Sequence, residues 1–283
     1  MARLSSDPAG LADLHVHTTA SDGTLSPAGV VQLAVQAGLA AIAIADHDSV
    51  DAVDEAVAAA LEHELWVIPA VEINTECGAG EAHILGYFIQ PADRWFRDFL
   101  ARQRAAREGR AQRMVERLAE LGYQVEWGRV LELAAGAVVT RPHVARALVE
   151  KGYIADVTAA LTGLLATSGP AYVPRGKLSP HDAVVAVRRA GGVAVLAHPG
   201  TGGHDELIDE LIESGLAGIE AYHPQHSRAQ QDWYARRGDS RGLVVTGGSD
   251  FHGSDGPGSS AIGDCAVPVS IIGQLLARLP VAG

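Results

Sequence analysis

Short apolar segments that end in histidine or acidic residues constrain the fold of this chain more than any other feature. The first carries the motif DLHVHT at residues 13–18, and GSDFHG occupies residues 248–253. Between them lie four similar positions: ADHD at 45–48, Glu72, His83 and AHPG at 197–200. Polar groups that follow buried apolar segments are costly unless they bind something. The pattern therefore predicts strands whose ends converge on a common site.

Apolar strands alternate with amphipathic helical segments over most of the chain. We expect strands at residues 11–18, 40–45, 65–74, 82–89, 192–197, 218–222 and 243–246. Helical patterns lie at residues 26–38, 49–63, 205–214, 227–237 and 271–279, and another begins at 179. This alternation is typical of an α/β protein with a parallel sheet covered by helices. Ligand-type residues at the carboxyl ends of about seven strands favour a closed or nearly closed barrel.

One segment interrupts this alternation. Residues 94–121 form one long helical pattern, and shorter helical patterns follow at 141–151 and 155–166. The segment has no good strand candidate. We therefore predict a barrel domain made of residues 1–95 and 170–283, with a helical insertion at 96–169 that covers the active site.

The composition limits the possible partners and compartment. The 283 residues are 47% hydrophobic, and 34 acidic against 22 basic residues give a net charge of −12. Such an acidic chain is not expected to bind long duplex nucleic acid, but a small anionic substrate remains possible. Two cysteines, no signal-peptide pattern and no apolar stretch of about 20 residues predict a cytoplasmic protein without a membrane contact. Nothing in the sequence indicates an oligomeric state.

The imidazole and carboxylate groups predict a metal centre. His15 and His17 stand two residues apart on a predicted strand, so both face the same side, and Asp250 and His252 repeat this spacing. Nitrogen and oxygen ligands without thiolate suit Zn, Mn or Fe. The nine candidate ligands exceed the roughly four that a tetrahedral ion takes. We therefore expect two or three clustered divalent ions, which indicate hydrolysis of an ester, most naturally a phosphoester.

Four cationic or histidine residues are predicted to line the substrate pocket. Arg141 and His143 lie at the predicted N-terminus of a helix, where phosphate is attracted, and Arg175 and Lys177 lie in a loop with proline and glycine. His223 follows a strand and is a candidate general acid or phosphate contact. The pair Gly247-Gly248 is expected to permit a close backbone approach before Asp250. Four further histidines are interpreted as surface residues: His63, His181, His204 and His226.

The ordered motifs DLHVHT, ADHD, VEI, AHPG and GSDFHG resemble those of the PHP (polymerase and histidinol phosphatase) family of metal-dependent phosphoesterases. The resemblance implies a distorted seven-stranded (β/α) barrel with two or three Mn, Fe or Zn ions, of which Mn is expected here. The implied ligands are His15, His17, Asp22, His47, Glu72, His83, His198, Asp250 and His252. Glu72 would bridge two ions. The implied groups are His15, His17, Glu72 and Asp250; then Glu72, His83 and His198; then Asp22, His47 and His252. Asp46 is interpreted as a carboxylate that orients a histidine in the catalytic site.

Within this family the chain most resembles stand-alone bacterial 3′,5′-nucleoside bisphosphate phosphatases with a helical insertion. The resemblance implies hydrolysis of the 3′-phosphate of a substrate such as pAp to give a 5′-nucleotide. Arg141 or Arg175 would neutralise the phosphoryl oxygens, and His223 would protonate the departing oxygen. A 5′→3′ exoribonuclease acting on short 5′-phosphorylated RNA, or a phosphatase acting on histidinol phosphate, remains an alternative. An amidohydrolase is disfavoured because no lysine ends a predicted strand, and a non-catalytic PHP module because the ligand set is complete.

Overall fold

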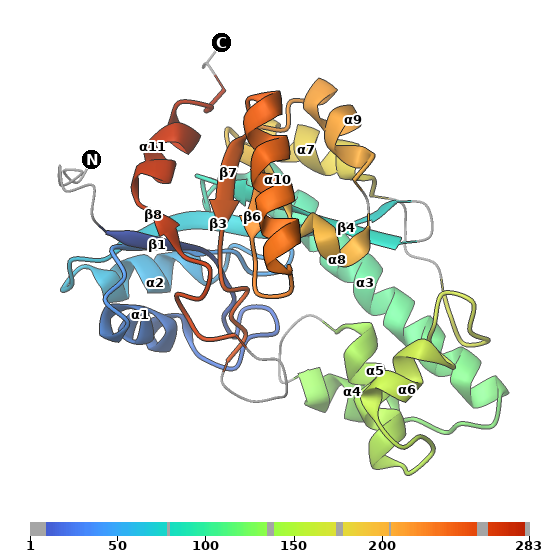
Figure 1. Ribbon diagram of the computed structural model, residues 1–283. Helices are drawn as coiled ribbons and strands as arrows, with labels where there is room; N and C mark the ends of the chain where they lie inside the picture. Colours follow the sequence, from blue (N-terminus) through green and yellow to red (C-terminus); the bar gives the residue numbers. More distant parts are fainter. Residues whose placement is uncertain are drawn as a thin grey trace. The chain divides into compact units, whose positions relative to one another are not determined.

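The computed structural model describes residues 10–77, 80–134, 139–173, 178–203, 205–253 and 260–280. The chain divides into two compact units (Figure 1). The barrel unit contains the residues up to Arg97 and those from Leu178 onward, and the helical unit is Asp98–Lys177. The sequence predicts a helical insertion at 96–169, and the helical unit of the structure runs from Asp98 to Lys177.

The described residues of the barrel unit form one sheet of eight strands. The strands are β1 (Leu11–Val16), β2 (Ala41–Ile44), β3 (Trp66–Cys77), β4 (Gly80–Tyr87), β5 (Val193–Ala197), β6 (Gly218–Tyr222), β7 (Val244–Gly247) and β8 (Val267–Pro268). Their order in the sheet is β7-β6-β5-β4-β3-β2-β1-β8. After β7 the chain returns to β1, where Phe251 bridges Val16, so the sheet is a nearly closed barrel. The predicted α/β barrel is confirmed.

The direction of β4 corrects the expectation of a purely parallel sheet. β4 is antiparallel to both β3 and β5, whereas β1, β2 and β3 run parallel to one another, as do β5, β6 and β7. The reason is chain length: β3 ends at Cys77 and β4 begins at Gly80. A parallel crossover needs a dozen residues or more, and so short a connection permits only a hairpin.

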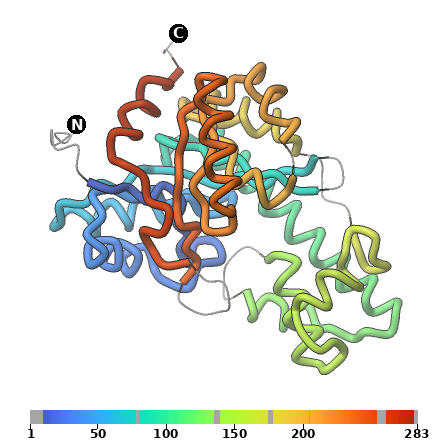
Figure 2. The backbone as a smooth tube through the Cα atoms, in the orientation of Figure 1, coloured from blue at the N-terminus to red at the C-terminus, as the bar shows by residue number. Residues whose placement is uncertain are grey.

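Helices cover the outside of the barrel. They are α1 (Pro27–Gln36), α2 (Val53–Ala60), α7 (Pro180–Arg189), α8 (Pro199–Gly202), α9 (Leu207–Glu213), α10 (Arg228–Arg241) and α11 (Ser270–Leu276). The Ser26 side chain accepts from Gly29 N, and Ser179 and Ser227 form capping boxes with Asp182 and Gln230. Figure 2 shows the resulting alternation of strands and helices along the backbone. Each cap satisfies an N–H group that the first helical turn would leave unpaired.

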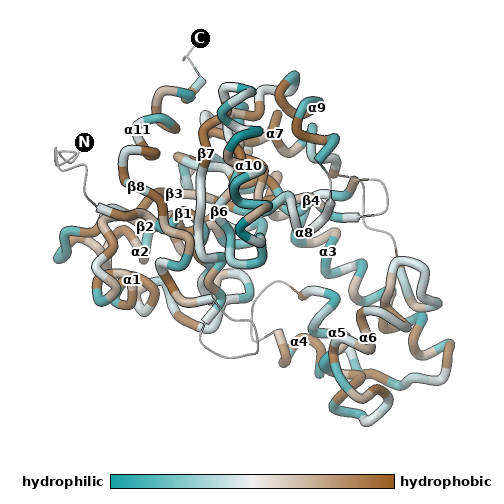
Figure 3. The backbone as a smooth tube through the Cα atoms, in the orientation of Figure 1, coloured by the Kyte–Doolittle hydropathy of each residue, from teal (hydrophilic) through white to brown (hydrophobic). Residues whose placement is uncertain are grey.

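The alternation of side chains along the strands separates two apolar clusters. On β2, Ala41 and Ala43 belong to one cluster with Leu14 and Tyr87, whereas Ile42 and Ile44 pack in the other with residues of α1 and α2. Figure 3 shows apolar residues along the central strands and polar residues along much of α10. Successive residues of a strand point to opposite faces. The same strand therefore contributes side chains both to the interior of the barrel and to the contact with the helices that cover it.

The helical unit has a hydrophobic core of its own. Its helices are most of α3 (Arg94–Glu120), α4 (Trp127–Ala134), α5 (Arg141–Glu150) and α6 (Val157–Thr162). Met114, Leu118, Val130, Val144 and Leu148 are buried together. Helix α4 was not predicted from the sequence. Across the described residues of both units, every helix is too short or too polar to span a bilayer.

Candidate metal centre

The nine predicted ligands converge at the rim of the barrel where β1, β2, β5, β6 and β7 have their carboxyl ends. The most buried group contains His15, His17, Glu72 and Asp250. Both Nε2 atoms, of His15 and of His17, lie 3.4 Å from Glu72 Oε2. Asp250 Oδ1 lies 3.4 Å from His15 Nε2 and 3.0 Å from His17 Nε2. The spacing of two residues at the end of β1 therefore places both imidazoles against the same pair of carboxylates.

A second group forms around the other oxygen of Glu72. Glu72 Oε1 lies 2.7 Å from His83 Nδ1 and 3.0 Å from His198 Nε2. His83 lies near the start of β4 and is paired with Ala197, the last residue of β5. The antiparallel direction of β4 thus places the beginning of that strand at the same rim as the ends of its neighbours. Glu72 consequently contacts ligand candidates on both sides.

The third group lies on the more exposed side of His17. It contains Asp22, His47 and His252, whose ligand atoms gather with those of His17. Asp22 Oδ1 lies 3.2 Å from His252 Nε2, and Asp22 Oδ2 lies 3.7 Å from His47 Nε2. The His17 and His252 rings stack with centroids 4.0 Å apart. All three groupings that the family resemblance implies are thus neighbours in space.

Several buried polar atoms of this cluster have no hydrogen-bond partner within the described structure. They are His15 Nε2, His17 Nε2, Asp22 Oδ1 and Glu72 Oε2. Buried nitrogen and oxygen atoms without partners are uncommon in folded proteins, and each needs an explanation. In the first and third groups, the latter together with His17, the ligand atoms lie within 4.8 Å of one another. This donor set fits divalent cations, which would satisfy the four atoms.

The electrostatics of the cluster favour the protonation states that coordinate metals at His17 and Glu72. Burial, reinforced by the nearby His252 and His47, lowers the pKa of His17 to about 3. Burial alone would raise the pKa of Glu72, but the surrounding His47, His83 and His15 hold that pKa well below its ordinary value. A neutral imidazole and an ionised carboxylate are the forms that coordinate metals.

The backbone before Asp250 approaches β1 so closely that only glycine fits. A Cβ atom on Gly248 would lie 2.4 Å from His15 Cβ, and one on Gly247 would lie 2.6 Å from Tyr222 Cβ. The predicted close approach is thus present. It lets Asp250 N donate to His15 O at 2.9 Å, which places the Asp250 carboxylate beside the His15 and His17 rings.

Two buried carboxylates outside the predicted set support this rim. Glu220 on β6 accepts from His15 Nδ1 at 3.0 Å and from His198 N at 2.9 Å. Asp13 accepts from Ser249 N at 2.9 Å and from Gly263 N at 2.8 Å. Sequence reasoning did not assign Glu220 a role. The available signal was a single acidic residue inside the apolar strand GIEAY.

Asp46 requires a correction. We expected its carboxylate to orient a histidine, but its hydrogen bonds go to Thr18 N at 2.8 Å, Thr18 Oγ1 at 2.7 Å and Ser21 Oγ at 2.6 Å. Burial raises the pKa of Asp46. The side chain therefore fixes the turn at residues 18–21, which leads into Asp22. It reaches His17 only through Ser21, whose Oγ lies 3.5 Å from His17 Nδ1.

His223 lies at the rim, and His226 is not the surface residue that the sequence suggested. His223 is buried, with Nε2 3.3 Å from Asp250 Oδ2 and Nδ1 accepting from Gln225 N at 3.2 Å. His226 is only 4% exposed. Its Nδ1 donates to Ala221 O, and its Nε2 accepts from Gly200 N. Packing between β6 and α8 buries it, which a single sequence does not reveal.

The predicted substrate residues belong to the helical unit or lie outside the described residues. His143 caps its own helix, because its Nδ1 accepts from Thr140 N at 2.9 Å. Arg141 Nη1 donates to Leu165 O at 3.2 Å. Arg175 and Lys177, together with His204, lie outside the described residues.

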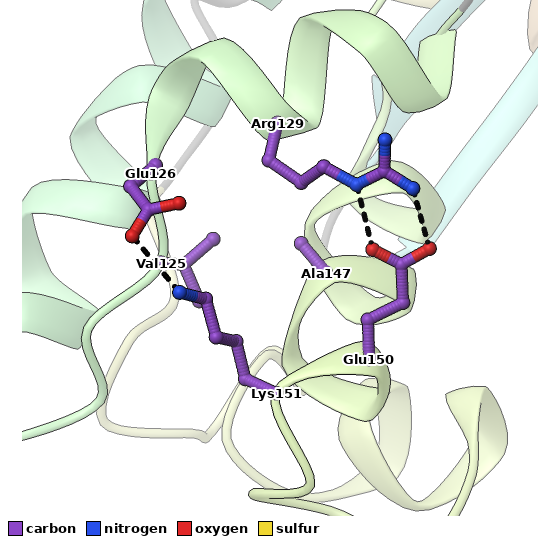
Figure 4. A pocket seen from close by; sticks show the side chains of 6 residues that line it. All are labelled: Val125, Glu126, Arg129, Ala147, Glu150 and Lys151. Carbon is purple, nitrogen blue, oxygen red and sulfur yellow. Dashed lines mark hydrogen bonds and ion pairs between the residues drawn. The ribbon is translucent and has the colours of Figure 1, made fainter.

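The helical unit also contains a pocket of about 200 Å³. Its lining includes two ion pairs (Figure 4). Arg129 forms a two-pronged pair with Glu150 through Nε at 2.8 Å and Nη2 at 2.9 Å, and Lys151 Nζ lies 2.9 Å from Glu126 Oε1. Both cations are thus paired with carboxylates, so this pocket offers little to an anionic substrate.

Comparison with known proteins agrees with the geometry. The PHP domain family matches residues 13–90. The 5′-3′ exoribonuclease Rnm of Salmonella typhimurium is 36% identical over 85% of this chain and 84% of that protein. The 3′,5′-nucleoside bisphosphate phosphatase of Chromobacterium violaceum is 34% identical over 89% of this chain and 90% of that protein. A solved structure from Bifidobacterium adolescentis, assigned as a metal-dependent phosphoesterase, superposes with a TM-score of 0.83 at 33% identity and covers 95% of this chain and 96% of its own.

Proposed function

We propose that this chain, which belongs to the PHP family of metal-dependent phosphoesterases, hydrolyses the 3′-phosphate of nucleoside 3′,5′-bisphosphates such as pAp. The products are a nucleoside 5′-monophosphate and phosphate. The observation that carries the proposal is the convergence of nine imidazole and carboxylate side chains on one rim. The similarity to the bisphosphate phosphatase of Chromobacterium violaceum supports the choice of substrate.

The metal centre would hold two or three divalent ions, with Mn²⁺ as the expected metal. The nine ligands would be His15, His17, Asp22, His47, Glu72, His83, His198, Asp250 and His252. Bound divalent ions supply charge that neutralises phosphoryl oxygens, and they activate water. Glu72 contacts side chains of all three groups through its two oxygens, with His47 Nδ1 2.8 Å from Oε2, and this supports its assignment as a shared ligand.

His223 is proposed as the acid that protonates the departing 3′-oxygen. The acid is the imidazolium, which gives its Nε2 proton to the oxygen and keeps the proton on Nδ1, so the contact that Nδ1 of the neutral ring makes with Gln225 N opens when the ring is protonated. Nε2 lies 3.3 Å from Asp250 Oδ2, which holds that proton at the rim where the substrate would bind. A positioned acid of this kind typically contributes about 10²–10⁴-fold to the rate.

Four residues outside the rim are proposed to contact the phosphates of the substrate: Arg141, His143, Arg175 and Lys177. Arginine can grip a phosphate with two parallel hydrogen bonds, and lysine acts as a point charge. Among the four, the role is best supported for Arg141. This residue begins α5, where the N–H groups of the first turn favour anions.

A 5′-3′ exoribonuclease is the second candidate. The Salmonella typhimurium relative of that name is 36% identical over 85% of this chain. The same centre would then cut the 3′-phosphodiester beside a 5′-phosphorylated nucleotide. In either case the partner is a small nucleotide or a short RNA. We also propose a cytoplasmic location, which the two unpaired cysteines, Cys77 and Cys265, support.

The test is release of phosphate in the presence of Mn²⁺ from pAp, 5′-AMP, histidinol phosphate and a short 5′-phosphorylated RNA. We expect pAp to be the preferred substrate, with 5′-AMP as the product. Preferred turnover of histidinol phosphate would contradict the choice of substrate. Faster release of mononucleotides from the RNA would favour the exoribonuclease.

A further inference from the structure

We propose that Glu220 is a positioning residue that fixes two metal ligands at once: the ring of His15 and the backbone of His198. The proposal rests on the proposed metal-dependent function. Glu220 is fully buried at the centre of β6 and is not among the nine predicted ligands. Its Oε1 lies 3.0 Å from His15 Nδ1, and its Oε2 accepts from His198 N at 2.9 Å. One carboxylate thus joins two of the ligand groups.

The contact with His15 determines which ring nitrogen faces the centre. A neutral imidazole carries one N–H, and the nitrogen without hydrogen is the one that coordinates. Because a carboxylate only accepts hydrogen bonds, Glu220 holds the proton of His15 on Nδ1. The lone pair of Nε2 is then directed at the carboxylates of Glu72 and Asp250, each 3.4 Å away.

The contact with His198 acts on the backbone. His198 has φ of 23° and ψ of 56°, a positive-φ conformation that non-glycine residues rarely adopt. Such strain persists where surrounding contacts hold it. The bond from His198 N to Glu220 Oε2 is a contact of this kind, since it fixes the residue at the point where β5 ends. The His198 ring can then reach Glu72 Oε1 at 3.0 Å.

A direct ligand role for Glu220 fits the geometry less well. Glu220, His15 and His198 do form a group whose ligand atoms lie close together. However, both oxygens of Glu220 already accept hydrogen bonds from the two histidines. The His15 nitrogen on that side is Nδ1, while Nε2 faces Glu72 and Asp250. The arrangement is that of a carboxylate behind a histidine ligand.

The variant Glu220→Gln tests the proposal with little change of shape. If the amide oxygen keeps the His198 N–H, the amide NH₂ must face His15 Nδ1 and moves the ring proton to Nε2. If the amide oxygen faces His15 instead, the NH₂ meets the His198 N–H, and two donors oppose each other. Either orientation disturbs one ligand. The matched control is Glu213→Gln, which changes an exposed glutamate on α9.

Two measurements test the effect of Glu220→Gln on the metal ligands in the absence of substrate. Titration with Mn²⁺ against a chelator should show 10- to 100-fold weaker binding of the ions in the groups of His15 and His198, the usual range for such residues. The group of Asp22, His47 and His252 should bind as in the parent protein. Histidine-selective ¹⁵N NMR of the Zn²⁺-loaded parent protein should show His15 protonated on Nδ1, with its signal assigned by His15→Gln. Glu220→Gln should lose that signal if the amide NH₂ faces His15, and should keep it, with weaker binding at the His198 group alone, if the amide oxygen faces His15.

Four outcomes would overturn the proposal. One is unchanged Mn²⁺ affinity in Glu220→Gln, and another is a parent His15 that is protonated on Nε2. The third is an equal loss of affinity at every ion with a lower melting temperature, which would indicate a merely structural role. Complete loss of a single ion would show a direct ligand and would also contradict the proposal. None of these results depends on pAp turnover, so failure of the phosphatase assay on the parent protein is a separate result.

Discussion

The role of a single residue at the rim depends on the side chains and backbone groups that it contacts. The residue type alone does not reveal those contacts. The motifs were enough to identify nine side chains that gather at the rim, because each follows or lies in an apolar strand. Glu220 and His226 were missed, because their roles depend on β5, β6 and α8 coming together. The contacts of Asp46 were missed for the same reason: its carboxylate accepts from Thr18 and Ser21 and reaches His17 only through Ser21.

Gly248→Ala should disrupt the rim from the backbone side. The new Cβ would meet His15 Cβ at 2.4 Å, and such overpacking typically costs about 1–3 kcal/mol. We expect a lower melting temperature and weaker Mn²⁺ binding, measured by calorimetry and chelator competition. Gly273→Ala is the control, because nothing lies within 4 Å of its new Cβ and the site is helical. Equal stability of the two variants would show that the rim tolerates a shift.

Asp46→Ala should loosen the turn that carries Asp22. Removing the carboxylate leaves the donors of Thr18 and Ser21 unpaired in a buried place, at a cost of about 1–3 kcal/mol for each unsatisfied group. The ion held by Asp22, His47 and His252 should bind most weakly, which Mn²⁺ titration can measure. Glu62→Ala, at an exposed site, should bind Mn²⁺ like the parent. Selective loss at the His15 group instead would contradict the assignment.

At the scale of elements, the sequence predicted strand positions better than strand directions. Strand β6 was predicted with its bounds at Gly218 and Tyr222. The reversal of β4 was missed because an apolar strand has the same pattern in either direction, and only the short connection after Cys77 reveals it. Helix α8 and strand β8 have four and two residues, too few for a periodic pattern to emerge.

His226→Leu should separate two elements that support the site. The ring links β6 to α8, because it donates to Ala221 O at 2.9 Å and accepts from Gly200 N at 3.0 Å. Leucine removes both bonds and leaves two backbone groups unpaired, with an expected loss of about 1–3 kcal/mol for each. Binding of the ion that involves His198 should weaken, since α8 follows that residue directly. His63→Leu, at an exposed site, is the control, and equal unfolding free energies in urea would contradict the linking role.

At the scale of the whole molecule, the two units have separate cores, so the metal centre should stabilise them unequally. All nine predicted ligands belong to the barrel unit, whereas Met114, Leu118, Val144 and Leu148 are buried in a cluster of the helical unit. A ligand that binds only the folded state adds about 2.7 kcal/mol at a concentration of 100 Kd. Removal of metal also leaves buried ligand atoms of the barrel unit unpaired, which lowers the stability of that unit further.

Removal of metal with EDTA should therefore raise hydrogen exchange mainly in the barrel unit. We expect the largest increase in amide exchange in peptides from β1, β3 and the residues around Asp250, measured by mass spectrometry. Peptides that contain Met114, Leu118, Val144 or Leu148 should exchange at nearly the same rate with and without Mn²⁺. His17→Ala with Mn²⁺ present should reproduce part of the EDTA pattern. An equal increase in both units would show that the helical unit depends on the metal centre for its stability, and no increase in either unit would contradict the metal centre itself.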